Sequence, residues 1–145
     1  MNSNRIIREI ANDGSVVIRD SRCGFVFRRL RAGIVEIRIT GTDNGQFGTT
    51  IIDEITLALY RERSIRLFVD ASEGTILPAS VSSAWARFFE LNVSSLERVM
   101  ILATSKATSL TMQIIRHLSG TGDLVQVLSD PDLYEARKAA AVGST

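Results

Sequence analysis

Strand-like and helix-like segments alternate three times in the second half of this chain, and this alternation constrains the fold more than any other feature. Short apolar runs at Ile65–Val69, Val99–Ala103 and Leu124–Leu128 are expected to be strands. Each is followed by a stretch whose apolar residues recur every three or four positions, as in a helix buried on one side. Near-continuous apolar strands alternating with helices are typical of a sheet that is at least partly parallel and covered by helices. An α/β domain is therefore predicted.

The helices that follow these strands are expected at Ser80–Leu91, at Lys106–Leu118 and after Asp130. The last has the clearest start. Asp130 can accept from free backbone N–H groups, and proline at position 131 has the fixed φ that suits a first helical position. Residues Ala139–Thr145 are expected to form a frayed end.

Before these units the sequence predicts a hairpin and another helix. The hairpin strands are Phe25–Leu30 and Ile34–Thr40. In the second strand apolar residues alternate with polar ones such as Glu36, which is the pattern of a sheet with one wetter face. Apolar residues at helical spacing from Phe47 to about Arg61 then predict a helix.

Residues 1–22 are ambiguous, and we treat them as an N-terminal extension or extra strand. Ile6, Ile7 and Ile10 could line a short helix, whereas Ser15–Ile18 resembles a strand after a turn. The main domain is expected to span 23–142, with 143–145 as a tail.

Bulk properties exclude several classes of function. A chain of 145 residues fits one domain, and a net charge of +1 gives no overall field to attract nucleic acid. A single cysteine, Cys23, excludes an internal disulfide and a cysteine-based metal cluster, and favours a reducing compartment. No apolar run approaches the roughly 20 residues of a membrane span, and the N-terminus has no secretory pattern. A cytoplasmic protein without cofactor, metal or nucleic-acid partner is expected.

The most informative candidate site is a group of serines around the start of the Ser80–Leu91 helix. Its members are Ser72, Ser80, Ser82 and Ser83. A phosphate added there would carry close to two negative charges. A helix N-terminus can stabilise that charge, whereas in an interface the charge can break the contact. In the plainer interpretation, Ser80 is an N-cap and the other serines are packing or solvent residues.

Asp70 ends the strand that precedes these serines. It could be an acid, a metal ligand or a phospho-acceptor, but a receiver domain needs a lysine after its last strand, and here Ser129-Asp130 follows. We expect Asp70 to bind N–H groups of the loop.

The remaining candidates are weaker. Thr104, Ser105 and Lys106 open a helix after an apolar strand, so they could hold an anion through backbone donors and one cation. The glycine-rich run GTDNGQFG lacks the lysine of a phosphate loop and is interpreted as a turn. His117 has no partner at a ligand spacing and is expected at a helix surface.

The chain resembles the STAS domain, the fold of bacterial anti-sigma factor antagonists. The resemblance rests on the order of hairpin, helix and three strand–helix units, and on Val-Asp-Ala-Ser before a serine-bearing helix start, and it covers roughly Gly24–Ala140. It implies a central mixed sheet, an N-terminal hairpin and about four helices. In that family a strand ending in Asp-Leu-Ser leads to an Asp-Ser-Ser-Gly-Leu-Gly segment, whose second serine is phosphorylated by a partner kinase.

Matching the strand ends places Ser80 at the phosphorylated position. The segment departs from the family pattern at Pro78, Ala79, Val81 and Ser83. A divergent, SpoIIAA-like group, related in fold to the Sec14 lipid-binding domain, similarly lacks a clean phosphorylation motif.

We therefore expect a non-enzymatic regulatory module that binds a protein partner: a kinase, a phosphatase or a sigma-regulating protein. The first alternative is a carrier of a lipid or nucleotide between helices and sheet, suggested by Trp85, Phe88, Phe89 and Met112 on apolar faces. The second is a structural homodimer built through a sheet edge or helix face. An enzyme comes last, because no paired acid and base, nucleophile elbow or metal set can be named.

Overall fold

A computed structural model describes residues 5–74 and 78–143, and residues 75–77, within the expected break after the Ile65–Val69 strand, lie outside the described residues. The strands are β1 (Ile7–Ile10), β2 (Val16–Arg19), β3 (Cys23–Arg31), β4 (Ile34–Gly41), β5 (Ile65–Gly74), β6 (Leu96–Leu102) and β7 (Val125–Leu128). The helices are α1 (Thr50–Glu62), α2 (Ala79–Leu91), α3 (Lys106–Ser119) and α4 (Pro131–Gly143), with a short 3-10 turn at Gly122–Leu124. The predicted α/β class is confirmed.

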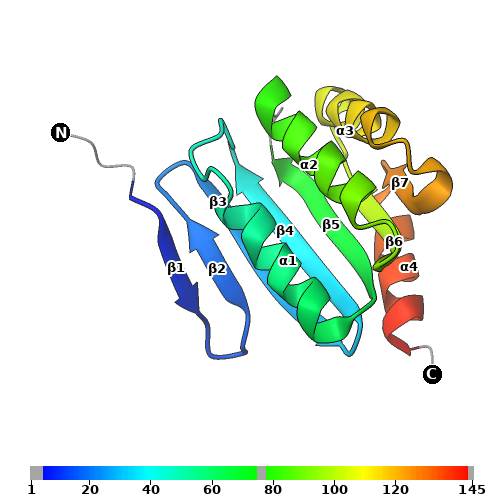
Figure 1. The fold of residues 1–145 in the computed structure, drawn as a ribbon, viewed down its shortest axis with the longest axis horizontal. Coiled ribbons are helices and arrows are strands. Elements are labelled where there is room, and N and C mark those ends of the chain that lie inside the picture. The colour runs from blue at the N-terminus through cyan, green and yellow to red at the C-terminus, as the bar shows by residue number, and fades with distance from the viewer. Residues whose placement is uncertain (1–4, 75–77, 144–145) are drawn as a thin grey trace.

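All seven described strands form one sheet in chain order. Strands β1 to β4 pair antiparallel, and β4 to β7 pair parallel. Helices α1, α2 and α3 lie on one face of the sheet, and α4 lies on the other (Figure 1). The mixed sheet with an N-terminal hairpin therefore matches the expected architecture.

The described part of the N-terminal segment, residues 5–22, contributes two strands. The hairpin between β1 and β2 turns at Gly14, whose φ of +88° suits glycine, and Asp13 accepts from the backbone N–H of Ser15 at 2.9 Å. Arg8 on β1 donates to both carboxylate oxygens of Glu54 on α1, at 2.8 and 3.2 Å. A helix over Ile6–Ile10 is therefore wrong, because pairing with β2 and this contact hold the segment as a strand.

Element boundaries differ from the expected ones at several places. Phe47 precedes α1 rather than starting it, because its ring packs edge-on against Phe25 at 5.3 Å from inside a glycine-rich turn. Strand β5 continues to Gly74, five residues beyond its expected end at Val69. Helix α4 continues to Gly143, so the predicted frayed end from Ala139 is wrong for its described part. The start of α4 is as predicted, since Asp130 accepts from the N–H of Asp132 at 3.0 Å.

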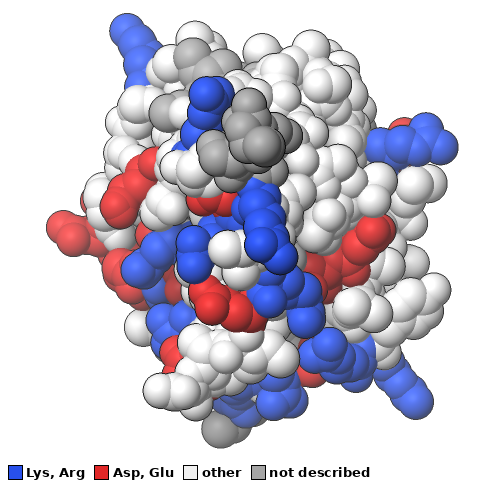
Figure 2. All heavy atoms as spheres, turned by 90° about the vertical axis from the view of Figure 1, so that its left-hand side faces the viewer, with Lys and Arg blue, Asp and Glu red and all other residues white. Residues whose placement is uncertain are grey.

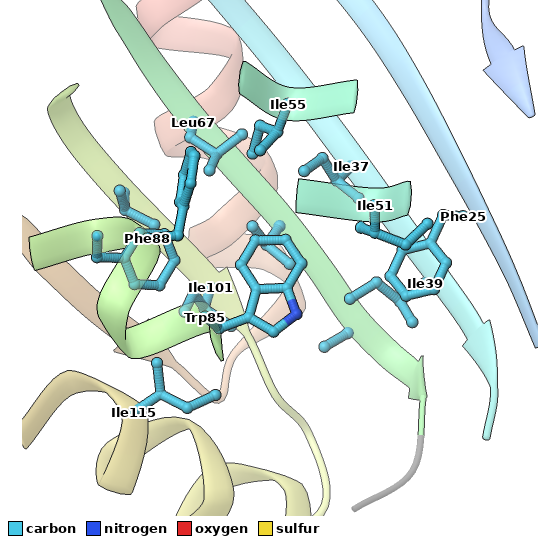
Figure 3. Packing of buried hydrophobic residues seen from close by; sticks show 14 of the residues in the cluster. Phe25, Ile37, Ile39, Ile51, Ile55, Leu67, Trp85, Phe88, Ile101 and Ile115 are labelled. Carbon is cyan, nitrogen blue, oxygen red and sulfur yellow. The ribbon is translucent and has the colours of Figure 1, made fainter. Parts of the chain in front are cut away.

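The main core lies between the sheet and helices α1 to α3. Trp85 and Phe88 of α2 point at the sheet, with Ile115 of α3 beside them (Figure 3). Ile37 on β4 and Leu67 on β5 meet them from the strands, and both are completely buried. This apolar contact fixes α1, α2 and α3 on the sheet and so positions their N-termini.

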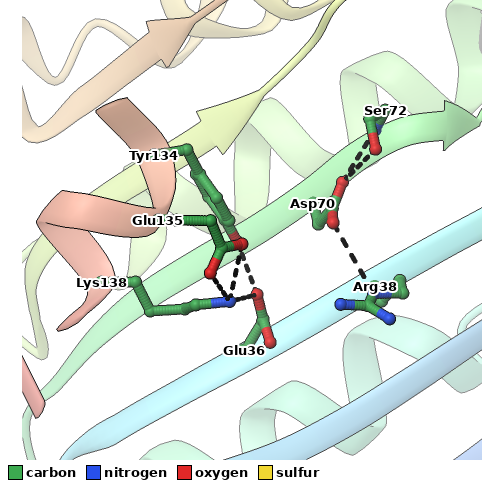
Figure 4. A network of polar contacts seen from close by, with 7 residues as sticks. All are labelled: Glu36, Arg38, Asp70, Ser72, Tyr134, Glu135 and Lys138. Carbon is green, nitrogen blue, oxygen red and sulfur yellow. Dashed lines mark hydrogen bonds and ion pairs between the residues drawn. The ribbon is translucent and has the colours of Figure 1, made fainter. Parts of the chain in front are cut away.

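A second, smaller core lies under α4. The ring of Tyr134 stacks edge-on against Phe68 of β5 at 5.9 Å, and the Tyr134 hydroxyl donates to Glu36 on β4 at 3.0 Å. Lys138 donates to the same carboxylate oxygen at 2.7 Å (Figure 4). Burial and the charge of Glu36 raise the pKa of Tyr134, so its phenol stays a neutral donor. The prediction that Glu36 lies on a more solvated face of the sheet is wrong, because α4 covers this residue and leaves it only 2% exposed.

The side of the molecule that carries the β1 edge has a mixed charge distribution. Lys and Arg side chains alternate there with Asp and Glu side chains (Figure 2). Arg19, for example, lies 3.3 Å from Glu9 on the neighbouring strand. On this side, opposite charges therefore lie next to one another.

The buried Glu36 carboxylate predicts how α4 is held. Replacing Lys138 by Met leaves that charge without its ammonium partner, and should lower the free energy of unfolding by about 3 kcal/mol in urea denaturation. The matched control is Glu135→Gln, because Glu135 also contacts Lys138 at 3.0 Å but is half exposed, and it should cost less than about 1 kcal/mol. Equal effects of the two changes would contradict the role of Glu36.

Candidate functional site

The carboxyl ends of β4 and β5 and the starts of α1 and α2 meet at one edge of the sheet (Figure 1). The chain enters this edge through Gly41, with φ +82°, where a side-chain Cβ would collide with the carbonyl oxygen of Arg22. Only glycine fits such a close approach of two backbones. The loop that follows is therefore fixed against the turn between β2 and β3.

A groove of about 190 Å³ separates this loop and α1 from the first turns of α2. Its apolar lining comprises Phe47, Ile51, Ile52, Val81, Ala84 and Trp85. Its polar lining includes Asp43 on the loop and Ser80 on α2. The groove is thus an apolar surface with a carboxylate on one side and a hydroxyl on the other.

Ser80 is the second residue of α2 and is exposed. The N-cap is Pro78, whose carbonyl oxygen accepts from the N–H groups of Val81 and Ser82 at 3.0 Å each. Interpreting Ser80 as a plain N-cap is therefore wrong, because the capping position falls two residues earlier. Its side chain lies on the solvent side of the first turn, beside the groove.

The other serines are distributed differently. Ser82 lies on the buried side of α2, and Ser83 on the same helix is exposed. Ser72 lies on β5, where both its N–H (3.0 Å) and its hydroxyl (2.6 Å) donate to Asp70. The second oxygen of Asp70 lies 3.6 Å from the guanidinium of Arg38 (Figure 4). Asp70 therefore holds the end of β5 in place, on the sheet face opposite the groove.

Asp43 belongs to a buried group of titratable side chains behind the groove. Its carboxylate accepts from the N–H of Gly45 at 2.9 Å, and burial, with a further contribution from the charge of Asp20, raises its pKa. Burial, followed by the charges of Asp43 and Asp20, raises the pKa of Cys23 to about 12. The thiol therefore stays protonated at neutral pH.

Thr104, Ser105 and Lys106 lie at the carboxyl end of β6, along the same edge. All three are exposed, and Ser105 is the N-cap of α3. Its hydroxyl oxygen accepts from the Thr108 N–H at 3.1 Å. This hydroxyl caps the helix, and the groove lining described above includes none of the three residues.

The sequence did not predict that Phe47 would line the groove beside Ser80. The run from Gly41 to Gly48 is interpreted as a turn, and its glycines indeed have positive φ. The overlooked signal is Phe47, an aromatic residue inside a glycine-rich turn, which here is 3% exposed and lines the groove. His117 is exposed near the end of α3, as expected.

Within residues 5–74 and 78–143, no three His, Cys, Asp or Glu side chains are placed to share a metal ion. The described helices also include none with the length and apolar character needed to cross a bilayer.

Two solved structures share the architecture of this chain, an α/β fold with one mixed sheet. The anti-sigma factor antagonist SpoIIAA in its unphosphorylated form has a TM-score of 0.54 and 14% identity, over 79% of this chain and 96% of that one. The Bacillus cell fate determinant SpoIIAA in its phosphorylated form has a TM-score of 0.52 and 17% identity, over 78% and 98%. No family model and no curated protein sequence matches. The chain therefore has the SpoIIAA fold that its sequence predicts.

The raised pKa of Asp43 predicts a pH-dependent stability. Well below the ordinary aspartate pKa of about 4, the carboxyl is protonated in both folded and unfolded chains, and the stability of the fold decreases as the pH rises from that value through the raised folded-state pKa. Asp43→Asn keeps an acceptor for Gly45 but removes the charge. Its melting temperature should exceed that of the parent at pH 7 and approach it near pH 4. The fully exposed Asp123, changed to Asn, is the control and should shift neither value.

Proposed function

We propose that this protein is a non-enzymatic, cytoplasmic regulatory module that binds a protein partner through the groove between α1 and α2, with Ser80 as the contact or switch residue. The observation that carries the proposal is the exposed Ser80 at the rim of an apolar groove. An apolar depression with a polar rim is the usual anatomy of a protein-binding surface. A kinase, a phosphatase or a sigma-regulating protein is the class of partner we propose.

The fold supports this proposal. One solved neighbour is described as an anti-sigma factor antagonist, and SpoIIAA is known in unphosphorylated and phosphorylated forms. The sequence resemblance implies that Ser80 stands where such proteins carry the modified serine.

The charges around Ser80 determine how a phosphate on this residue would affect partner binding. The positive end of the α2 helix dipole favours a negative charge, whereas the carboxylate of Asp43 in the same groove opposes it. A partner seated on the partly exposed Ile52 and Val81 would have to desolvate that phosphate. We therefore propose that modification releases the partner.

The core does not favour the alternative of a ligand between helices and sheet. The space there, lined by Trp85, Phe89 and Met112 among others, is about 20 Å³, roughly one water molecule. These side chains are buried and in contact, and Trp85 lies 5.8 Å from Phe89 between ring centres.

The experiment is an affinity capture from host lysate with parent, Ser80→Ala and Ser80→Glu proteins, followed by binding measurements with the recovered partner. Ser80→Glu should weaken binding by a factor of roughly 10 or more, since about 1.4 kcal/mol corresponds to one tenfold step. Ser80→Ala, which adds no charge, should bind within a few-fold of the parent.

Ser83→Glu is the matched control. It adds the same charge to an exposed serine on the same helix, three residues away and outside the groove lining. Equal binding by Ser80→Glu and parent, or equal losses from Ser80→Glu and Ser83→Glu, would contradict a switch at Ser80.

A further inference from the structure

A second groove lies on the opposite face of the sheet, at the amino ends of β5 and β6 and under the C-terminal half of α4. Its volume is about 480 Å³, within the roughly 300–1,000 Å³ of small-molecule sites. Three arginines line it: Arg66 from β5, Arg98 from β6 and Arg137 from α4. Two segments of the sheet and one helix thus direct guanidinium groups to one place.

The strand register sets two of these charges side by side. Arg66 and Arg98 are direct partners across the parallel β5–β6 pair, so their side chains leave the same face of the sheet from adjacent strands. Like charges in such a position repel and disfavour pairing. Such an unfavourable pair of like charges is expected where a binding site requires both arginines.

The carboxylates nearby leave this cluster positive. Glu97 lies 3.5 Å from Arg66, and both side chains are about half exposed, so the pair is weak. Within residues 5–74 and 78–143, neither Arg98 nor Arg137 forms an ion pair with a carboxylate.

The positive charge continues into an adjoining groove that shares Arg66, Glu97 and Ala141 with the first. Together the two grooves are lined by six arginines and two glutamates, an excess of four positive charges on a chain whose net charge is +1. This end of the molecule therefore concentrates positive charge that the rest of the chain offsets.

The walls between the arginines are apolar. Phe68 and Met100 form the floor, and Ala140 and Ala141 on α4 face them. Arg31 donates to the carbonyl oxygen of Val142 at 2.7 Å, which fixes the C-terminal end of α4 over the sheet. The groove is thus a fixed slot with an apolar bed and cations at its rim.

We propose that this groove binds an organic phosphate, with the phosphate held by Arg98 and Arg137 beside Arg66, and the apolar part of the ligand lying on Met100 and Ala140. Guanidinium groups match phosphate oxygens in bidentate geometry, and the apolar bed gives an amphipathic ligand an advantage over inorganic phosphate. The ligand is either a free organic phosphate or the headgroup of a phospholipid, because both present this chemistry.

The test is an NMR titration of the full chain labelled with ¹⁵N. The probes are phenyl phosphate, a free organic phosphate, and a short-chain phosphatidic acid kept below its micelle concentration, with the matching uncharged diacylglycerol as the control ligand. Binding should shift amide signals of Arg66–Phe68, Arg98–Met100 and Arg137–Ala141. A stronger response to phosphatidic acid would identify a lipid headgroup, and an equal or stronger response to phenyl phosphate would identify a free organic phosphate.

The variant for this test is Arg98→Gln with Arg137→Gln. It should weaken binding at least 10-fold for both probes. The matched control is Arg28→Gln with Arg87→Gln, which removes two exposed arginines outside both grooves and should leave binding within twofold. Preserved spectra will show that each variant is folded.

Three results would overturn the proposal: no shifts in these segments with either probe, unchanged affinity in the Arg98/Arg137 variant, or an equal loss in both double variants. The assay uses neither Ser80 nor a protein partner. Its failure would therefore leave the proposed partner groove standing, and the reverse also holds.

Discussion

Strand β4 is the element on which the rest of this structure depends, because it joins an antiparallel half to a parallel half. It pairs antiparallel with β3 and parallel with β5. Its Ile37 and Ile39 enter the core beneath α1 to α3, while Glu36 points the other way and holds α4 through Tyr134 and Lys138. One strand thus positions both helical layers.

The same strand also fixes the proposed partner site. At its end, Gly41 passes so close to Arg22 that no side chain fits, and the loop turns back to bring Phe47 and Asp43 opposite the start of α2. Ser80 is then presented by a helix whose Trp85 and Phe88 are buried in the core. The site therefore rests on helices and strands packed on the core, which suits a surface proposed to distinguish a hydroxyl from a phosphate.

The two proposed binding surfaces lie at opposite ends of the parallel strands and on opposite faces of the sheet. The Ser80 groove lies between α1 and α2 at the carboxyl ends of β4 and β5. The arginine groove lies under α4 at the amino ends of β5 and β6. A ligand in one does not sterically block the other. β5 passes between them, with Arg66 at one end and Asp70 towards the other.

The sequence predicts much of the fold because local periodicity decides it. The strands from Ile65 and Val99 and the helix from Pro131 follow directly from apolar spacing and from capping at Asp130. The burial of Glu36 and the groove beside Ser80 depend on contacts between residues far apart in the sequence, so local patterns could not predict them. Nothing in the local pattern distinguishes a buried Glu36 from a solvated one, since its partners lie about 100 residues further along the chain. The groove beside Ser80 likewise needs Phe47, whose place depends on packing against Phe25.

Hydrogen–deuterium exchange of the complex between this protein and the captured partner is the decisive measurement for the proposed groove between α1 and α2. We expect slowed exchange in residues 43–52 and 78–85, with α4 unchanged, and loss of that protection when Ser80 is phosphorylated. Protection confined to α4 or to the β1 edge, or protection that phosphorylation leaves intact, would contradict it.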